Sequence, residues 1–108
     1  MVEMTPIALM RGTAVGITVR LSRTTLIVAA APGGYVMCGA LDVRLLDERL
    51  KARRIVAARV LGARSLSDLL QADVDDLTEG AAALGVARGM SGREALERML
   101  GAAGAAAP

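Results

Sequence analysis

The hydrophobic period of this chain first changes close to Asp42. Before that residue, apolar side chains either alternate with other residues or form short continuous runs, and both patterns are typical of β-strands. Pro6 cannot donate a ladder hydrogen bond, so the first strand is expected at a sheet edge. We expect four strands, separated by turn signals, over residues 2–10, 13–21, 25–31 and 35–38. Together they predict an antiparallel β meander.

The second of these strands shows the clearest alternation. Val15, Ile17, Val19 and Leu21 share one face, and Gly16 with its alternate neighbours occupies the other. Period two of this kind predicts a half-buried strand.

After Asp42 the period is that of a helix. Val43, Leu46 and Leu50 form an apolar stripe opposite charged residues, which predicts an amphipathic helix of about three turns. Residues 55–62 are again apolar and are expected to form a strand. Strand, helix and strand then make one βαβ unit, whose two strands should be parallel and joined by a right-handed crossover.

The last third of the chain predicts short helices. One is expected after Ser65 as N-cap, one within residues 78–85, and one after Ser91, which forms a capping-box pattern with Glu94. The acidic stretch 73–76 is interpreted as a polar loop. The fold class is therefore α+β: an N-terminal antiparallel meander, one βαβ unit and C-terminal short helices. We expect one domain over residues 1–100 and a flexible Ala/Gly tail over 101–108.

The composition favours self-association. Hydrophobic residues make up 54% of the chain, but Tyr35 is the one aromatic residue. A core without large rings must be filled by small and branched side chains. An excess of such apolar surface on a chain of 108 residues indicates an interface, so a homo-oligomer is expected.

Composition also excludes several classes of protein. The single cysteine rules out an internal disulfide framework and favours the cytoplasm, and no signal peptide or membrane span is expected. With no histidine, no spaced acidic motif and no P-loop, we expect no metal and no cofactor. The arginines of residues 44–64 are interleaved with carboxylates, so we interpret them as solvated faces and ion pairs rather than a nucleic-acid surface.

Cys38 is the first candidate site residue. It ends a predicted strand, Gly39 follows it, and a helix begins at Asp42, so backbone N–H groups there could favour a thiolate or an anion. No histidine is available to act as its base, and a free cysteine is most often a small core residue. Asp42 is interpreted mainly as a helix cap. Tyr35 belongs to the same stretch, so Tyr35, Cys38, Gly39 and Asp42 form one candidate ligand site.

Ser91 and Arg93 form the second candidate. A Ser-Gly pair that opens a helix, with an arginine in the first turn, could hold a small anion on backbone N–H groups. The alternative is a capping box between two helices.

Two segments carry a resemblance to a known family. "GGYVMCGALDVRLLDERLKARRIVAARVLGARSLSDLL" and "GVARGMSGREALERML", together with the strand-rich start "MTPIAL", resemble the YunC-like family of bacteria and archaea, over about residues 5–100. The resemblance implies an α+β fold whose N-terminal β region is used in oligomerisation, with a tetramer as the expected assembly. It implies no activity.

Two functional hypotheses follow, and whether the protein is an enzyme stays open between them. The first is a small cytosolic domain that binds copies of itself and acts as a binding or assembly module. The second is a small enzyme or ligand sensor with its site around Cys38, where backbone N–H groups near Gly39 and Arg93 from the last helix would join it.

Overall fold

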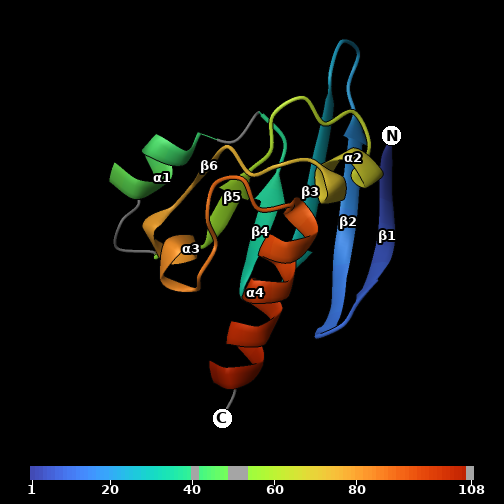
Figure 1. Cartoon of the computed structure of the whole chain (residues 1–108). Coiled ribbons are helices and arrows are strands. Elements are labelled where there is room, and N and C mark those ends of the chain that lie inside the picture. The colour runs from blue at the N-terminus through green and yellow to red at the C-terminus, as the bar shows by residue number, and fades with distance from the viewer. Residues whose placement is uncertain (40–41, 49–53, 107–108) are drawn as a thin grey trace.

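The computed structural model describes residues 1–39, 42–48 and 54–106, and over these ranges the chain forms a six-stranded sheet and four helices (Figure 1). The strands are β1 (Val2–Leu9), β2 (Gly12–Arg20), β3 (Thr25–Ala31), β4 (Gly34–Met37), β5 (Ala57–Arg59) and β6 (Asp76–Leu77). The helices are α1 (Val43–Glu48), α2 (Leu66–Gln71), α3 (Glu79–Ala83) and α4 (Gly92–Ala106). This architecture confirms the α+β class.

Every strand lies beside its neighbour in the chain. The order across the sheet is β1-β2-β3-β4-β5-β6, so β1 is an edge strand, as Pro6 predicts. The first four strands are antiparallel, which confirms the meander, and β4 and β5 are parallel around α1, which confirms the strand–helix–strand unit. The sheet is therefore mixed, with its one parallel pair near the middle of the chain.

Two predicted elements differ from the structure. The strand β5 covers three residues rather than 55–62. Val56 and Val60 on either side of it also make main-chain hydrogen bonds to β4, and the chain turns at Gly62 with a φ of +76°. The prediction that residues 73–76 form a polar loop is wrong at its last residue. Its last residue, Asp76, pairs with Arg59 and begins the short strand β6, whose single apolar residue gives almost no strand signal.

Two helices differ in length from the expectation. α1 is described only as far as Glu48, and residues 49–53, which the predicted helix would enter, lie outside the described part of the chain. α4 continues to Ala106, past residue 101, where composition predicts that a tail begins.

The main core lies between the sheet and α2 and α4. Ile27, Ala29 and Val36 point from the sheet toward Leu69 of α2 and Met99 of α4, and each of these side chains is fully buried or nearly so. In Figure 1 these two helices cross in front of the sheet. Aliphatic side chains and methionine thus fill the core of a chain that has almost no rings.

The helices cover the small-residue face of β2. Ala14 and Gly16 are buried, whereas Val15, Ile17 and Val19 on the other face stay partly exposed. The packing there is close: a Cβ on Gly16 would lie 2.3 Å from a methyl carbon of Leu66 in α2, so a larger residue would require the Leu66 side chain to move. The larger apolar side chains of β2 therefore lie on the side of the sheet away from α2 and α4.

A second, smaller core lies on that other side. Val43 of α1 packs on Ala57, with Tyr35, Leu46 and Ile55 around them. Since Tyr35 and Ala57 are paired across β4 and β5, α1 covers this side of the sheet only at its β4–β5 end. We call the remainder the open face. It consists of Val2, Met4, Pro6, Ala8, Thr13, Val15, Ile17, Val19, Leu26, Val28 and Ala30.

Candidate functional site

The Cys38 stretch is built into the fold. Cys38 is 6% exposed and belongs to the main core, and its N–H donates to the Ile27 carbonyl at 3.1 Å. Gly39 is exposed, and a Cβ there would lie 3.1 Å from a methyl carbon of Leu61. The thiol is thus held in packed surroundings at the end of β4.

The other two residues of this stretch lie around α1. The Asp42 carboxylate accepts a hydrogen bond from the Leu45 N–H at 3.0 Å, which is the capping geometry expected of it. Tyr35 is partly buried in the small core beneath α1. Both residues therefore have a structural task that their positions explain.

Ser91 caps α4. Its Oγ accepts from the Glu94 N–H at 3.1 Å, and its carbonyl accepts from the Ala95 N–H at 3.0 Å. The Glu94 carboxylate pairs with Arg98 at 3.2 Å, one turn further along. The predicted capping box is therefore present in the contact that Ser91 makes, the hydrogen bond from the Glu94 N–H to the serine oxygen.

A pocket of about 390 Å³ lies between the end of β1 and the first turns of α4. It contains the sequence-predicted pair Ser91 and Arg93, and Tyr35, Cys38, Gly39 and Asp42 are not part of its lining. Ala8, Leu9 and Met10 line it from β1 and the following turn, and Ser91, Arg93, Glu94 and Glu97 line it from α4 and its cap. The structure thus separates the two candidate sites. One guanidinium and two carboxylates share this pocket.

The glycines of "GMSGRE" have mechanical roles. Gly89 has a φ of +89°, in the left-handed region that favours glycine. Gly92 touches α2: a Cβ there would lie 2.0 Å from the Leu69 carbonyl oxygen, and the Gly92 N–H donates to the Ala72 carbonyl at 3.1 Å. At Gly92 the motif therefore lets the backbones of α2 and α4 come into direct contact.

Sequence reasoning missed Glu97. This carboxylate in α4 is 6% exposed, and its two oxygens accept hydrogen bonds of 3.0 Å each from the backbone N–H groups of Met10 and Arg11. The signal was its position between Leu96 and Met99, inside the buried stripe of α4. A glutamate next to the apolar stripe of a helix is usually interpreted as a solvent-exposed residue at the border of that stripe. The hydrogen-bond partners of Glu97 are also nearly ninety residues away in the sequence.

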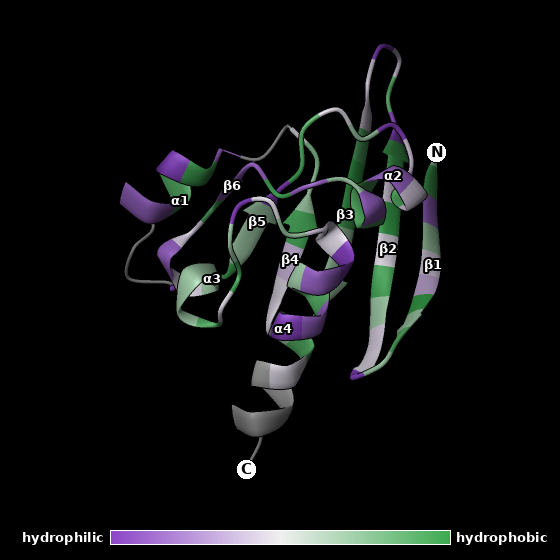
Figure 2. Ribbon diagram, in the orientation of Figure 1, coloured by the Kyte–Doolittle hydropathy of each residue, from purple (hydrophilic) through white to green (hydrophobic). Residues whose placement is uncertain are grey.

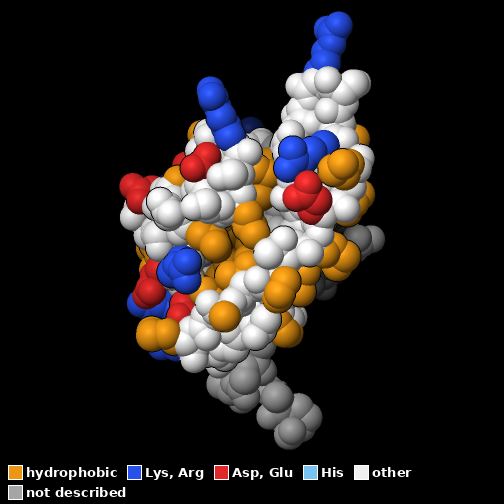
Figure 3. Space-filling model, turned by 90° about the vertical axis from the view of Figure 1, so that its right-hand side faces the viewer, with side chains coloured by type: hydrophobic (Ala, Val, Ile, Leu, Met, Phe, Trp, Pro, Cys, Tyr) orange, Lys and Arg blue, Asp and Glu red, His pale blue; other side chains and the backbone are white. Residues whose placement is uncertain are grey.

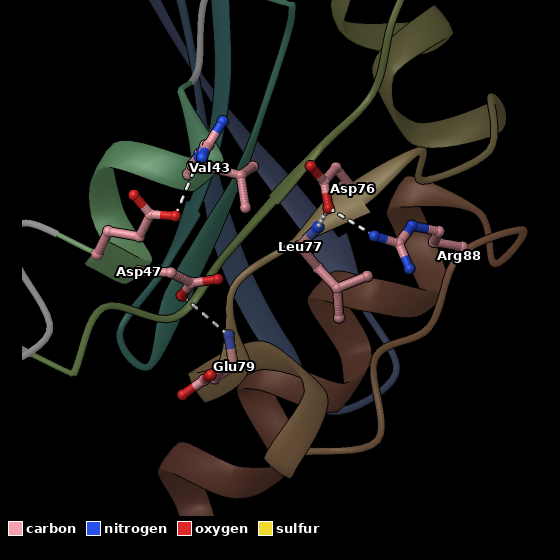
Figure 4. A pocket seen from close by; sticks show the side chains of 8 residues that line it. Val43, Asp47, Asp76, Leu77, Glu79 and Arg88 are labelled. Carbon is pink, nitrogen blue, oxygen red and sulfur yellow. Dashed lines mark hydrogen bonds and ion pairs between the residues drawn. The ribbon is translucent and has the colours of Figure 1, made fainter.

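A pocket of about 640 Å³ lies between α1, β6 and α3 (Figure 4). Arg88 pairs with Asp76 at 2.9 Å, and the Asp47 carboxylate accepts from the Glu79 N–H at 3.1 Å. Its lining mixes acidic, basic and apolar side chains: Val43, Arg44, Asp47, Glu48, Asp76, Leu77, Glu79 and Arg88. These charges largely pair with one another.

Arg59 ties β5 to the acidic segment. Its guanidinium donates from Nε and Nη2 to the Asp75 carboxylate, with the shortest contact at 2.8 Å, and lies 3.8 Å from Asp76. The hydrogen bond to Asp75 raises the pKa of Arg59 above its usual value, although partial burial opposes the shift. The ion pairs expected between the basic and acidic segments are confirmed here.

The described residues contain no group of three or more Cys, Asp or Glu side chains placed to hold a metal ion. Among the helices of residues 1–39, 42–48 and 54–106, none is long and apolar enough to cross a membrane.

Fold and site together define a small α+β domain with a mixed sheet, two separated candidate sites and one apolar sheet face. Residues 37–99 match the family described as a domain of unknown function, DUF1805, and the chain belongs to this family. It is 47% identical over 100 residues to the uncharacterized protein YunC of Bacillus subtilis strain 168, covering 93% of this chain and 99% of that protein. The resemblance to the YunC-like family is thereby confirmed.

The fold is shared with a solved structure. The crystal structure of a protein of unknown function from Thermoplasma acidophilum superimposes with a TM-score of 0.81, at 23% identity, over 92% of this chain and 93% of the other. The family and this structure share the description of unknown function, as expected for this chain.

Proposed function

We propose that this protein is a self-associating binding or assembly module, and that copies meet through the open face. The observation that carries the proposal is the chemistry of three cross-strand rows. Paired residues lie on the same face of a sheet, so the registers define these rows. They are Val2–Val19–Leu26, Met4–Ile17–Val28 and Pro6–Val15–Ala30. Every member of these three rows is apolar, and the next row pairs Ala8 with Thr13.

The β1–β2 hairpin carries most of its apolar side chains on the exposed side of the sheet and polar side chains on the helix side, the reverse of the arrangement expected when one face is solvated. In an antiparallel sheet with one solvated face, polar side chains normally take the solvated face. Here Glu3 and Arg20 lie on the helix side and form an ion pair at 3.2 Å, whereas Val2 and Met4 on the open face are 62% and 69% exposed. This pattern favours a partner on the open face. Figure 2 shows how hydrophobic the first four strands are.

A second copy of the chain fits this face best. The open face has few large rings and presents short aliphatic side chains, which interdigitate when two sheets pack face to face. It is bordered at β5 by the Arg59–Asp75 ion pair and by α1, so the apolar area has a polar limit. Figure 3 views the molecule from the side of β1 and shows hydrophobic side chains at that edge.

The edge of β1 supports a second contact. β1 has a partner strand on one side only, and an unpaired edge strand of eight residues is a template for pairing with another copy. A face contact and an edge contact, each two-fold, generate a tetramer through the N-terminal strands. We place the protein in the cytoplasm, a location that the free thiol of Cys38 supports.

The test compares two neighbouring lysine substitutions. Met4 and Thr5 are both exposed on β1 but point to opposite faces. Met4→Lys places a charge on the open face and Thr5→Lys places it on the other. Size-exclusion chromatography with light scattering should show a tetramer for the wild type and Thr5→Lys, and smaller species for Met4→Lys with unchanged circular dichroism. A monomeric wild type, or equal assembly of both variants, refutes the proposal.

A second candidate is a sensor site for a small anion at Ser91 and Arg93. Arg93 is exposed, lines the 390 Å³ pocket, and makes no ion pair with the described residues. Two carboxylates in the same lining weaken the attraction for an anion, so this function ranks second. Titration with inorganic phosphate should shift the amide resonances of residues 92–94 in the wild type but not in Arg93→Gln. Absence of a shift in both removes the candidate.

A further inference from the structure

The buried carboxylate of Glu97 holds the tip of the β1–β2 hairpin. Met10 and Arg11 are the two residues of the turn between these strands, and each gives its N–H to one oxygen of Glu97 at 3.0 Å. In return, the Arg11 guanidinium reaches the Glu97 carbonyl oxygen at 3.5 Å. One side chain of α4 therefore binds both N–H groups of a turn that lies at the opposite end of the sequence.

This contact is specific because a buried charge tolerates few alternatives. A carboxylate out of water is costly unless donors satisfy it, and hydrogen bonds to a charged acceptor are stronger than neutral ones. The two N–H groups are directed at different oxygens of Glu97, so both oxygens act as acceptors here. Replacement of one oxygen by an amide NH₂ would bring donor against donor.

The turn end of the hairpin has fewer strand partners than the rest of the sheet. β1 pairs only with β2, and the register of β2 with β3 runs from Val15 to Arg20, so residues 12–14 beside the turn have no partner in β3. Ile7 and Leu9 are the β1 residues that reach the main core, and both lie close to the turn that Glu97 holds. The other face of the same hairpin supplies Val2, Met4 and Ile17 to the open face.

We infer that Glu97 is a positioning residue that couples the docking of α4 to self-association, by fixing the twist and direction of the hairpin that carries most of the open face. The coupling rests on the proposed function. The attachment itself does not, and the two can be measured separately. The coupling implies that a change at α4, on the far side of the sheet, alters how tightly copies bind.

The first measurement is amide hydrogen exchange by NMR in the Met4→Lys background, where assembly is expected to be disrupted. Glu97→Gln should speed exchange at Met10 and Arg11 by about tenfold or more relative to amides of β3, as expected for loss of a charge-assisted hydrogen bond. Glu94→Gln is the matched control, because Glu94 lies on the same helix and pairs with Arg98 instead. Unchanged exchange at both amides overturns the inference.

The second measurement is the dissociation constant of assembly without the Met4 substitution. Glu97→Gln should weaken assembly by about tenfold or more, for the same lost hydrogen bond. Val86→Ala serves as a stability control, because Val86 is 3% exposed in the core and away from the hairpin turn. If both variants weaken assembly equally at equal loss of stability, the coupling is overturned. A monomeric wild type overturns both the proposed function and the coupling. The hydrogen-exchange measurement still tests whether Glu97 holds the turn at Met10 and Arg11.

Discussion

Gly92→Ala should destabilise the fold strongly, because Gly92 is where α4 meets the backbone of α2. A Cβ there would lie 2.0 Å from the Leu69 carbonyl oxygen and 3.0 Å from the carbonyl carbon. An ordinary carbon–oxygen contact is about 3.3 Å, so the two helices must separate by about 1 Å. That shift loosens the Gly92 hydrogen bond to Ala72 and the packing of Leu69 on α4.

The cost can be estimated from its parts. Overpacking against backbone costs about 3 kcal/mol, a weakened hydrogen bond adds about 1 kcal/mol, and the better helix propensity of alanine returns up to about 1 kcal/mol. The net loss is about 3 kcal/mol, a large share of the stability of a small domain. For a chain of this size it lowers Tm by roughly 15 °C.

Urea unfolding followed by circular dichroism, at one fixed protein concentration, measures this loss. Gly62→Ala is the matched control: nothing lies within 4 Å of a Cβ at Gly62, and its φ of +76° leaves only left-handed backbone strain of about 1 kcal/mol. If Gly92→Ala is no more destabilised than Gly62→Ala, the two helices separate without cost and the close-packing argument for the "GMSGRE" motif fails.

Two further predictions concern buried polar atoms. The buried Thr78 Oγ1 accepts from the Ala57 N–H at 3.1 Å and donates to the Ile55 carbonyl at 2.7 Å. Thr78→Val should therefore lower the free energy of unfolding in urea by about 2 kcal/mol, and Thr78→Ser by much less. Equal losses for the two variants would contradict this. Iodoacetamide should label Cys38 far more slowly in the folded protein than in urea, because the thiol is 6% exposed, and fast labelling of the folded protein at pH 9 would instead support a reactive site.

Much of the fold could be predicted because its signals are local. The alternation in β2, the caps at Ser65 and Ser91 and the change of period near Asp42 each depend on a few neighbouring residues. β6 could not be predicted, because Asp76 and Leu77 become a strand only through pairing with β5, and a two-residue strand has no period to detect. Which face of β2 the helices cover could not be predicted either, because it is decided by packing with distant residues.

The candidate site was less predictable than the fold. Ser91 and Arg93 do line a common pocket, and Asp42 does cap its helix, since those features follow from helix ends. Glu97 could not be found, because its role depends on the turn at Met10 and Arg11, and a glutamate in a helix carries no sign of a distant backbone partner. The separation of Cys38 from Ser91 likewise depends on tertiary packing: Cys38 lies in the main core, whereas Ser91 lines the pocket at the start of α4.

The strict chain order of the strands has a consequence for synthesis of the protein on the ribosome. Each strand can pair with the one made just before it, so the meander can form from short-range contacts while the rest of the chain is still being translated. α4 emerges last, yet it covers the sheet and brings Glu97 to the hairpin. Until α4 forms, the nascent chain carries apolar side chains on both faces of its sheet, and the packing of α4 is the step that buries much of one of them.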